Sequence, residues 1–186
     1  IRQTIFWTVV TGLLYPFAMT LALQAVFPGT AQGSLIKNAK GEAVGSALLA
    51  QPFSGKKYFW PRPSAAGYAT VPSGASNLGP TSKQLHDNVL ANAKALRDAN
   101  GLATNAPVPA DLVFTSASGL DPDISPEAAR FQIDRVATAR GLKPEEVATL
   151  VEQAIEPPQW GIFGDARVNV LKLNLALDEK FSASNR

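Results

Sequence analysis

One uninterrupted apolar stretch near the start of the chain constrains everything that follows it. Residues 4–27 read TIFWTVVTGLLYPFAMTLALQAVF and contain no charged side chain. A helix rises about 1.5 Å per residue, and about 20 apolar residues cross the hydrocarbon core of a bilayer. A core helix of a soluble protein is usually shorter and apolar on one face only, whereas this stretch is apolar on all sides. The sequence therefore predicts a transmembrane helix over residues 1–27.

A cleaved signal peptide is the alternative interpretation of the same stretch. Its apolar region would span about 7–15 residues and end at a cleavage site of small residues. Small residues do occur between Leu21 and Ala25, but the apolar run is longer than a signal peptide needs. We therefore expect the segment to act as an anchor.

Small residues recur along one face of the predicted span, which favours contact with a partner helix. At helical spacing this face contains Thr11, Tyr15, Ala18, Ala22 and Ala25. Small side chains let a second helix approach closely, although alanine and threonine are also common in membrane helices generally. The span also carries several threonines and one glutamine, a heavy polar load for a lone anchor. Pro16 removes one backbone donor, which predicts a kink.

Charges on either side of the span predict its orientation. Arg2 precedes it, and the next Lys or Arg is Lys37. Cytoplasmic flanks of membrane helices carry an excess of Lys and Arg. We therefore predict a single pass through the cell (inner) membrane, with a cytoplasmic N-terminus and a periplasmic, extracytoplasmic domain over residues 28–186.

Composition limits what this domain can be. About 160 residues follow the anchor, which is enough for a single domain with its own core. The chain has 17 Lys and Arg against 15 Asp and Glu, and this near balance argues against a nucleic-acid partner. The absence of cysteine excludes disulfides, thiol catalysis and cysteine-bound zinc.

Local signals predict an α+β fold, with one mixed domain after the transmembrane helix. Short strands joined by a turn are expected at 34–37 and 43–49, and a buried strand at 110–115. A terminal strand is expected at 167–177, with a change to helix near its end as the alternative. Helices are expected at 82–100, 126–140 and 143–156, since each range has capping residues and a periodic apolar face.

Residues 53–81 form a long aromatic-, proline- and glycine-rich segment without helical or strand periodicity. Long loops in compact domains are usually functional or disordered, and the aromatic residues argue against disorder. The stretch 73–77 could cradle an anion with its backbone donors, but it lacks the Gly-Lys-Ser/Thr ending of a P-loop. We favour an ordered packing loop.

Polar residues near 116–123 raise the possibility of catalysis. Ser116 or Ser118 would need a base within hydrogen-bond reach, and His86 is the only imidazole in the chain. Asp121 and Asp123 could hold a hard cation. The alternative, which we favour, is that these residues shape the turn and cap the following helix. We therefore predict no catalytic or metal-binding residue and assign no cofactor-binding residue.

Four motifs, in the same order along nearly the whole chain, carry a family resemblance. They are Tyr58-Phe59-Trp60-Pro61-Arg62-Pro63-Ser64, Ser76-Asn77-Leu78-Gly79-Pro80, Ser118-Gly119-Leu120-Asp121-Pro122 and Arg167-Val168-Asn169-Val170-Leu171. With the N-terminal membrane helix, they make the chain resemble the KdpC family, the C subunits of bacterial potassium-transporting P-type ATPases. The resemblance selects Arg62, Ser76, Asn77, Asp121 and Asn169 as candidate site residues. The chain departs from the family pattern at Ala75 (for Gly), Phe114 (for Thr) and Asp123 (for His).

The resemblance implies an accessory, non-catalytic subunit of an ATP-driven potassium uptake complex, needed for assembly and stability. Its implied partners are a channel-like potassium-binding subunit, a P-type ATPase subunit, a very small membrane subunit and membrane lipid. The resemblance also implies a possible role as a catalytic chaperone that raises the ATP affinity of the pump subunit. ATP would then be held in a ternary complex and not bound firmly by this chain. An extracytoplasmic domain without a P-loop fits direct ATP contact poorly.

Two other functions remain open from the sequence. One is a membrane-anchored extracytoplasmic hydrolase that uses Ser116 or Ser118 with His86 or Asp121. The other is a nucleotide-binding regulator in which the 73–77 loop, or glutamine side chains, would meet ATP.

Overall fold

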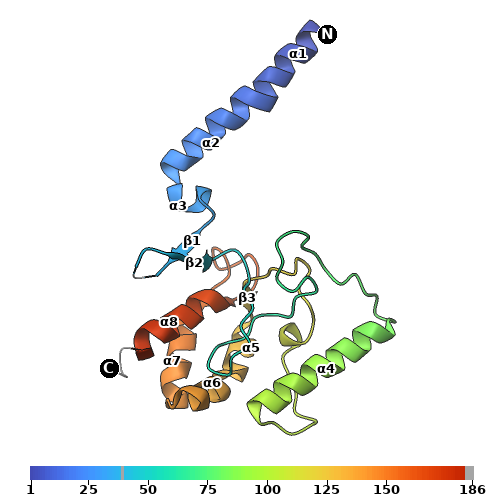
Figure 1. The fold of residues 1–186 in the computed structure, drawn as a ribbon, viewed down its shortest axis with the longest axis vertical. Coiled ribbons are helices and arrows are strands. Elements are labelled where there is room, and N and C mark those ends of the chain that lie inside the picture. The colour runs from blue at the N-terminus through green and yellow to red at the C-terminus, as the bar shows by residue number, and fades with distance from the viewer. Residues whose placement is uncertain (39, 183–186) are drawn as a thin grey trace. The chain divides into compact units, whose positions relative to one another are not determined.

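The computed structural model describes residues 1–38 and 40–182. Contacts between Cα atoms divide the chain into two compact units, Ile1–Leu48 and Leu49–Arg186. We describe each unit by itself (Figure 1) and call the second unit the folded domain. The domain boundary predicted at residue 28 stays a prediction.

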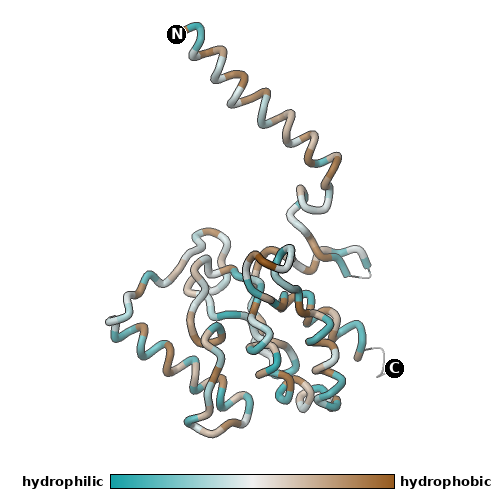
Figure 2. Tube along the Cα trace, turned by 180° about the vertical axis from the view of Figure 1, so that it is seen from behind, coloured by the Kyte–Doolittle hydropathy of each residue, from teal (hydrophilic) through white to brown (hydrophobic). Residues whose placement is uncertain are grey.

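The N-terminal unit begins with the expected apolar helix. It consists of α1 (Arg2–Val9), a π-helical turn (Val10–Leu14) and α2 (Tyr15–Val26). The whole stretch Arg2–Val26 is long and apolar enough to cross a membrane, and hydrophobic residues recur along it in Figure 2. Pro16 lies in the first turn of α2, directly after the π-helical turn. Proline and π-helical turns are both recognised causes of helix bending.

A short helix and a hairpin complete this unit. After α3 (Pro28–Ala31), β1 (Leu35–Lys37) pairs antiparallel with β2 (Ala43–Ser46). The side-chain oxygen of Asn38 accepts hydrogen bonds from the backbone N–H groups of Lys40 and Glu42, each at 3.0 Å. The predicted hairpin is confirmed, although its second strand ends three residues before Leu49 because the chain turns after Ser46.

The folded domain combines five α-helices with a small antiparallel sheet, counted over its described residues. The helices are α4 (Lys83–Asn100), α5 (Pro126–Phe131), α6 (Ile133–Arg140), α7 (Pro144–Ala154) and α8 (Val170–Ser182). The strands are β3 (Asp123–Ile124), β4 (Ile155–Glu156) and β5 (Arg167–Asn169), in the order β3-β5-β4. Helix α7 packs against both α6 and α8 (Figure 1). The predicted α+β class is confirmed.

Capping residues start and stop these helices where the sequence predicts. Ser82 caps α4 by accepting a hydrogen bond from the N–H of Leu85, and Gly101 ends it in the left-handed conformation at φ +65°. Ser125 caps α5, with proline at its first position. The helix predicted over 126–140 is interrupted at Gln132, which separates α5 from α6.

One predicted strand is wrong, and a second is confirmed only at its start. Within 110–115 the chain forms a 3₁₀ turn (Ala110–Leu112), although Leu112 and Val113 are buried as expected. The stretch 167–177 is a strand only as far as Asn169, and α8 follows at once. Asn169 caps α8, since its side-chain oxygen accepts a hydrogen bond from the N–H of Lys172 at 3.1 Å.

The hydrophobic core lies between the helices and the sheet. Its fully buried members include Phe59, Val136, Val151, Val168 and Leu173. Phe59 belongs to the long segment without regular structure, so this segment forms part of the core. The prediction of an ordered loop over 53–81 is confirmed.

Candidate functional site

Two buried amide side chains hold the first motif segment in place. Asn174 on α8 accepts a hydrogen bond from the N–H of Phe59 at 2.8 Å and donates one to its carbonyl oxygen at 3.0 Å. Gln132 makes the same pair of contacts with the backbone of Trp60, at 2.8 and 3.2 Å. An extended segment without a neighbouring strand thus obtains its backbone hydrogen bonds from side chains. We call Gln132 and Asn174 the amide clamp.

Arg135 on α6 reinforces this clamp. Its guanidinium donates to the carbonyl oxygens of Lys56 and Tyr58 and to the side-chain oxygen of Gln132, at 2.7, 3.0 and 2.6 Å. It also lies over the ring of Trp60, 4.3 Å from the ring centre. Burial lowers the pKa of Arg135 to about 10. Its partners are neutral, so Arg135 fixes the backbone without a carboxylate.

The first motif segment also contacts the 118–122 motif closely. The hydroxyl of Ser64 donates to the carbonyl oxygen of Gly119 at 2.7 Å and accepts from the N–H of Tyr68 at 2.9 Å. Gly119 has φ +70°, and a Cβ added there would lie 3.0 Å from the carbonyl oxygen of Gly74. The close contact with Gly74 and the positive φ therefore both favour glycine at position 119.

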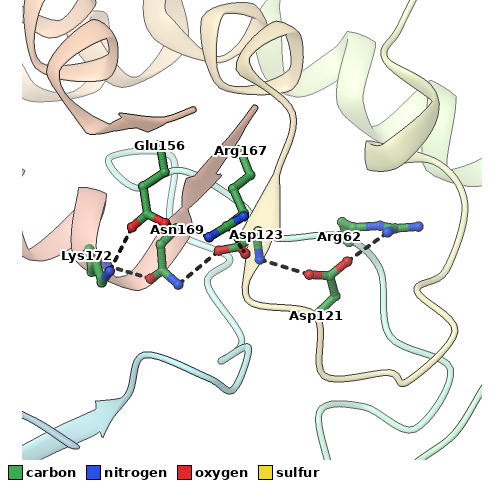
Figure 3. Close-up of polar contacts among 7 residues, drawn as sticks. All are labelled: Arg62, Asp121, Asp123, Glu156, Arg167, Asn169 and Lys172. Atoms are coloured by element: carbon green, nitrogen blue, oxygen red, sulfur yellow. Dashed lines mark hydrogen bonds and ion pairs between the residues drawn. The ribbon is translucent and has the colours of Figure 1, made fainter. Parts of the chain in front are cut away.

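A network of charged and polar side chains joins the motifs across the sheet. We call it the charged network, and Figure 3 shows its members: Arg62, Asp121, Asp123, Glu156, Arg167, Asn169 and Lys172. At one end, Arg62 pairs with Asp121 at 2.8 Å, and the other Asp121 oxygen accepts from the N–H of Asp123 at 3.1 Å. The motif residues Arg62, Asp121 and Asn169 are thus brought into one place.

The other end of the network crosses from β3 to β4 and α8. Asp123 accepts a hydrogen bond from Asn169 at 3.0 Å and lies 3.3 Å from Arg167. Glu156 pairs with Arg167 at 3.1 Å and with Lys172 at 2.9 Å. Burial raises the pKa of Asp123, whereas the hydrogen bond from Lys172 lowers the pKa of Glu156. The network holds sheet and helix together.

The other two motif residues lie beside a separate pocket. Asn77 adopts the left-handed conformation at φ +53°, and Ser76 lines a pocket of about 580 Å³ between the loop and α4. Gln84, Asn88 and Asn92 contribute polar side chains to its lining. This lining contains amides and hydroxyls without Lys or Arg.

The residues considered for catalysis do not form a nucleophile–base pair in the described part of the chain. Ser118 accepts a hydrogen bond from the N–H of Leu120, and His86 lies on the outer face of α4 with its side chain 71% exposed. Within the described part of the chain, neither Ser116 nor Ser118 hydrogen-bonds to His86 or Asp121 through its side chain. In the same part, no cluster of three or more His, Asp and Glu side chains could hold a metal ion.

The predicted partner-helix face is exposed along the span, at Thr11, Tyr15, Ala18, Ala22 and Ala25. The hydroxyl of Thr11 donates to the carbonyl oxygen of Trp7, and that of Thr20 to Pro16, each at 2.7 Å. These two threonines therefore satisfy their hydrogen bonds within their own helix. The face as a contact surface stays a prediction.

Sequence reasoning missed the three residues that hold the first motif segment: Gln132, Arg135 and Asn174. All three are buried, at 0%, 5% and 1% exposure. Asn174 offered a signal, since it interrupts an otherwise apolar helical face between Leu173 and Leu177. A buried polar residue needs a hydrogen-bond partner, but the sequence does not show that this partner is a backbone more than a hundred residues away.

These features define a class of protein. An N-terminal helix long and apolar enough to cross a membrane is followed in the chain by an α+β domain, and several motif side chains of this domain hold its own loops together. Residues 1–179 match the model of one family, described as KdpC, the K+-transporting ATPase c chain. The chain belongs to the KdpC family.

Curated relatives have the same name, potassium-transporting ATPase KdpC subunit. The relative from Burkholderia cenocepacia (strain HI2424) is 56% identical over 91% of this chain and 88% of its own length. The Myxococcus xanthus relative is 51% identical over 97% of this chain and 86% of its own length. The Geobacter sulfurreducens relative is 51% identical over 96% of this chain and 94% of its own length.

Proposed function

We propose that this chain is an accessory, non-catalytic subunit of an ATP-driven potassium uptake complex. Its partners would be a channel-like potassium-binding subunit, a P-type ATPase subunit and a small membrane subunit. Family membership supports the complex, and the names of the relatives supply its transported ion. Within this complex, the chain would contribute to assembly and stability.

One observation carries the non-catalytic role. The polar side chains Arg62, Ser64 and Asp121 of the family motifs are used in contacts within the domain. A catalytic residue would instead need to reach a substrate, with a base or a metal beside it. The motif contacts therefore favour a structural role in the complex over a catalytic one.

The transmembrane helix is the proposed site of contact with the other subunits in the bilayer. Ala18→Leu and Ala22→Leu would place bulky side chains on the predicted face, whereas Thr20→Leu places one on the opposite side of the helix. Co-purification with a tagged channel-like subunit measures assembly. We expect the alanine variants to reduce recovery at least tenfold while Thr20→Leu has little effect. Equal recovery of all three would reject this face.

The orientation is also a proposal, with the N-terminus in the cytoplasm and the domain outside the cytoplasm at the cell inner membrane. Arg2 before the span supports it. A reporter that is active only outside the cytoplasm, fused after the last residue, tests it. An inactive reporter, together with an active cytoplasmic control fusion, would indicate the opposite orientation.

A second candidate is direct contact with a nucleotide, and the pocket beside Ser76 favours it. Its amides and hydroxyls, including Gln84, could hydrogen-bond a base or a ribose. The lining offers no cation for a triphosphate, so a chaperone role would require ATP to be shared with the pump subunit. Calorimetry of the full chain with ATP tests the contact, with Gln84→Ala as the variant. No heat up to millimolar ATP would count against direct binding by the chain alone.

A further inference from the structure

The turn between β4 and β5 is an exposed feature of the domain that the proposed function does not use. Residues 157–164, with the sequence PPQWGIFG, form what we call the aromatic tip. Gln159 and Phe163 exchange two backbone hydrogen bonds, at 2.9 and 3.0 Å. The N–H of Gly161 also donates to the carbonyl oxygen of Pro158 at 2.9 Å. These bonds close the tip into a defined turn.

The tip presents large apolar side chains to the surroundings. Trp160, Ile162 and Phe163 are 83%, 76% and 56% exposed. The rings of Trp160 and Phe163 meet edge to face, with their centres 5.9 Å apart. Trp160 has φ +55°, a conformation that residues with a side chain adopt rarely. The fold therefore holds an unfavourable backbone conformation while leaving the indole uncovered, and such exposed patches mark contacts with a membrane or a partner.

The charge distribution favours a membrane as the surface that covers the tip. The eight residues of the tip contain no charged side chain. At its base, Glu156 and Arg167 pair with each other at 3.1 Å. Tryptophan and phenylalanine beside a polar base suit the interface of a bilayer, where an apolar body enters the acyl region and the polar groups remain hydrated.

The same chain also brings a bilayer within reach. The candidate membrane span ends at Val26, and the folded domain begins at Leu49. Even fully extended, this connection is no longer than about 80 Å. A domain of this size has a radius of gyration of about 14 Å, so the connection keeps its surface near the bilayer that the helix would cross. Tethering therefore raises the local concentration of the tip at the membrane.

We propose that the aromatic tip inserts into the interfacial layer of the bilayer that the N-terminal helix crosses. Trp160, Ile162 and Phe163 enter the lipid, and the paired charges at the base of the tip stay in water. The domain would then be held to the membrane at a second point, which limits its rotation about the linker.

The absence of cysteine from the chain allows a direct test. Ile162→Cys provides a single site for a nitroxide spin label in the full chain, reconstituted alone into phosphatidylcholine nanodiscs. Val71→Cys is the matched control, because Val71 is an apolar residue, 88% exposed, in another loop. We expect collisions with oxygen to exceed collisions with a water-soluble nickel chelate at position 162, and the reverse at position 71. Adding Trp160→Gln to Ile162→Cys should return the label to water.

Two results would overturn the proposal. One is a label at 162 that is as accessible to the nickel chelate as the label at 71. The other is a label that leaves water only after the other transporter subunits are added, which would assign the tip to an apolar recess on a protein. Circular dichroism of the labelled variants checks that the domain is folded in each case.

Discussion

Replacing Asn174 with leucine tests the amide clamp most directly. Leucine has the same branched arrangement of four side-chain heavy atoms, so Asn174→Leu removes two hydrogen bonds to Phe59 without leaving a cavity. Both backbone groups of Phe59 would remain buried, since the residue has 0% exposure. An unsatisfied buried polar group costs about 1–3 kcal/mol, so two should cost about 2–6 kcal/mol. Domains are typically stable by about 5–15 kcal/mol, so the loss is a large share of the total.

Urea unfolding of the full chain in detergent measures this loss. Trp7→Phe and Trp160→Phe leave Trp60, which contacts Arg135, as the single fluorescent reporter in the domain. The midpoint should fall by about 1–3 M urea, for a denaturant slope of about 2 kcal/mol per M. The control is Asn88→Leu on the exposed face of α4, which should change the midpoint little. If Asn174→Leu behaves like this control, the side-chain amide does not hold the motif segment.

Three further predictions concern the motif loops and the charged network. Gly119→Ala should lower the free energy of unfolding by about 2–4 kcal/mol, because it adds both left-handed strain and a contact of 3.0 Å. The control Gly141→Ala, at φ +68° in open space, should lower it by about 1 kcal/mol. Equal losses in urea unfolding would refute the packing argument. Arg62→Lys should cost less than about 1 kcal/mol in the same assay, because the pair with Asp121 is partly exposed; a loss of several kcal/mol would assign Arg62 a larger packing role. Burial raises the pKa of Asp123 above its ordinary 3.8, so its stabilising contribution is complete below pH 3.8 and is lost as pH rises through the folded-state pKa. The stability of Asp123→Asn relative to the unsubstituted chain should therefore improve as pH rises above 3.8. Thermal unfolding of both proteins at several pH values checks this. A stability difference that stays constant with pH would contradict the prediction.

Local sequence signals predicted the elements that depend on local physics. The apolar span follows from its length and lack of charge, and α4 follows from its cap at Ser82 and its end at Gly101. The hairpin follows from the turn residues near Asn38. Each signal depends on residues within a few positions of one another, so it acts in the same way in any tertiary fold.

The site was predicted only in part, because its contacts are long-range. The motifs pointed to Arg62, Asp121 and Asn169, which the structure brings into one network. They did not point to Gln132 or Asn174, since neither residue belongs to a quoted motif. One side chain on α8 and one at the junction of α5 and α6 hold the same irregular segment, and no spacing rule describes such an arrangement.

By itself, the sequence determined the long apolar helix, the class of fold, most helix boundaries and the family. Tertiary structure decided the stretches in which helix and strand compete, because a short apolar run looks the same in both. Within 110–115, Ala110–Leu112 forms a 3₁₀ turn, in which Asp111 accepts a hydrogen bond from the N–H of Ser125 at 2.8 Å. The stretch after Asn169 became a helix because helical spacing lets Leu173, Asn174 and Leu177 all face the interior. Burial of that one face, and of Phe59 behind it, selected the helix over the predicted strand.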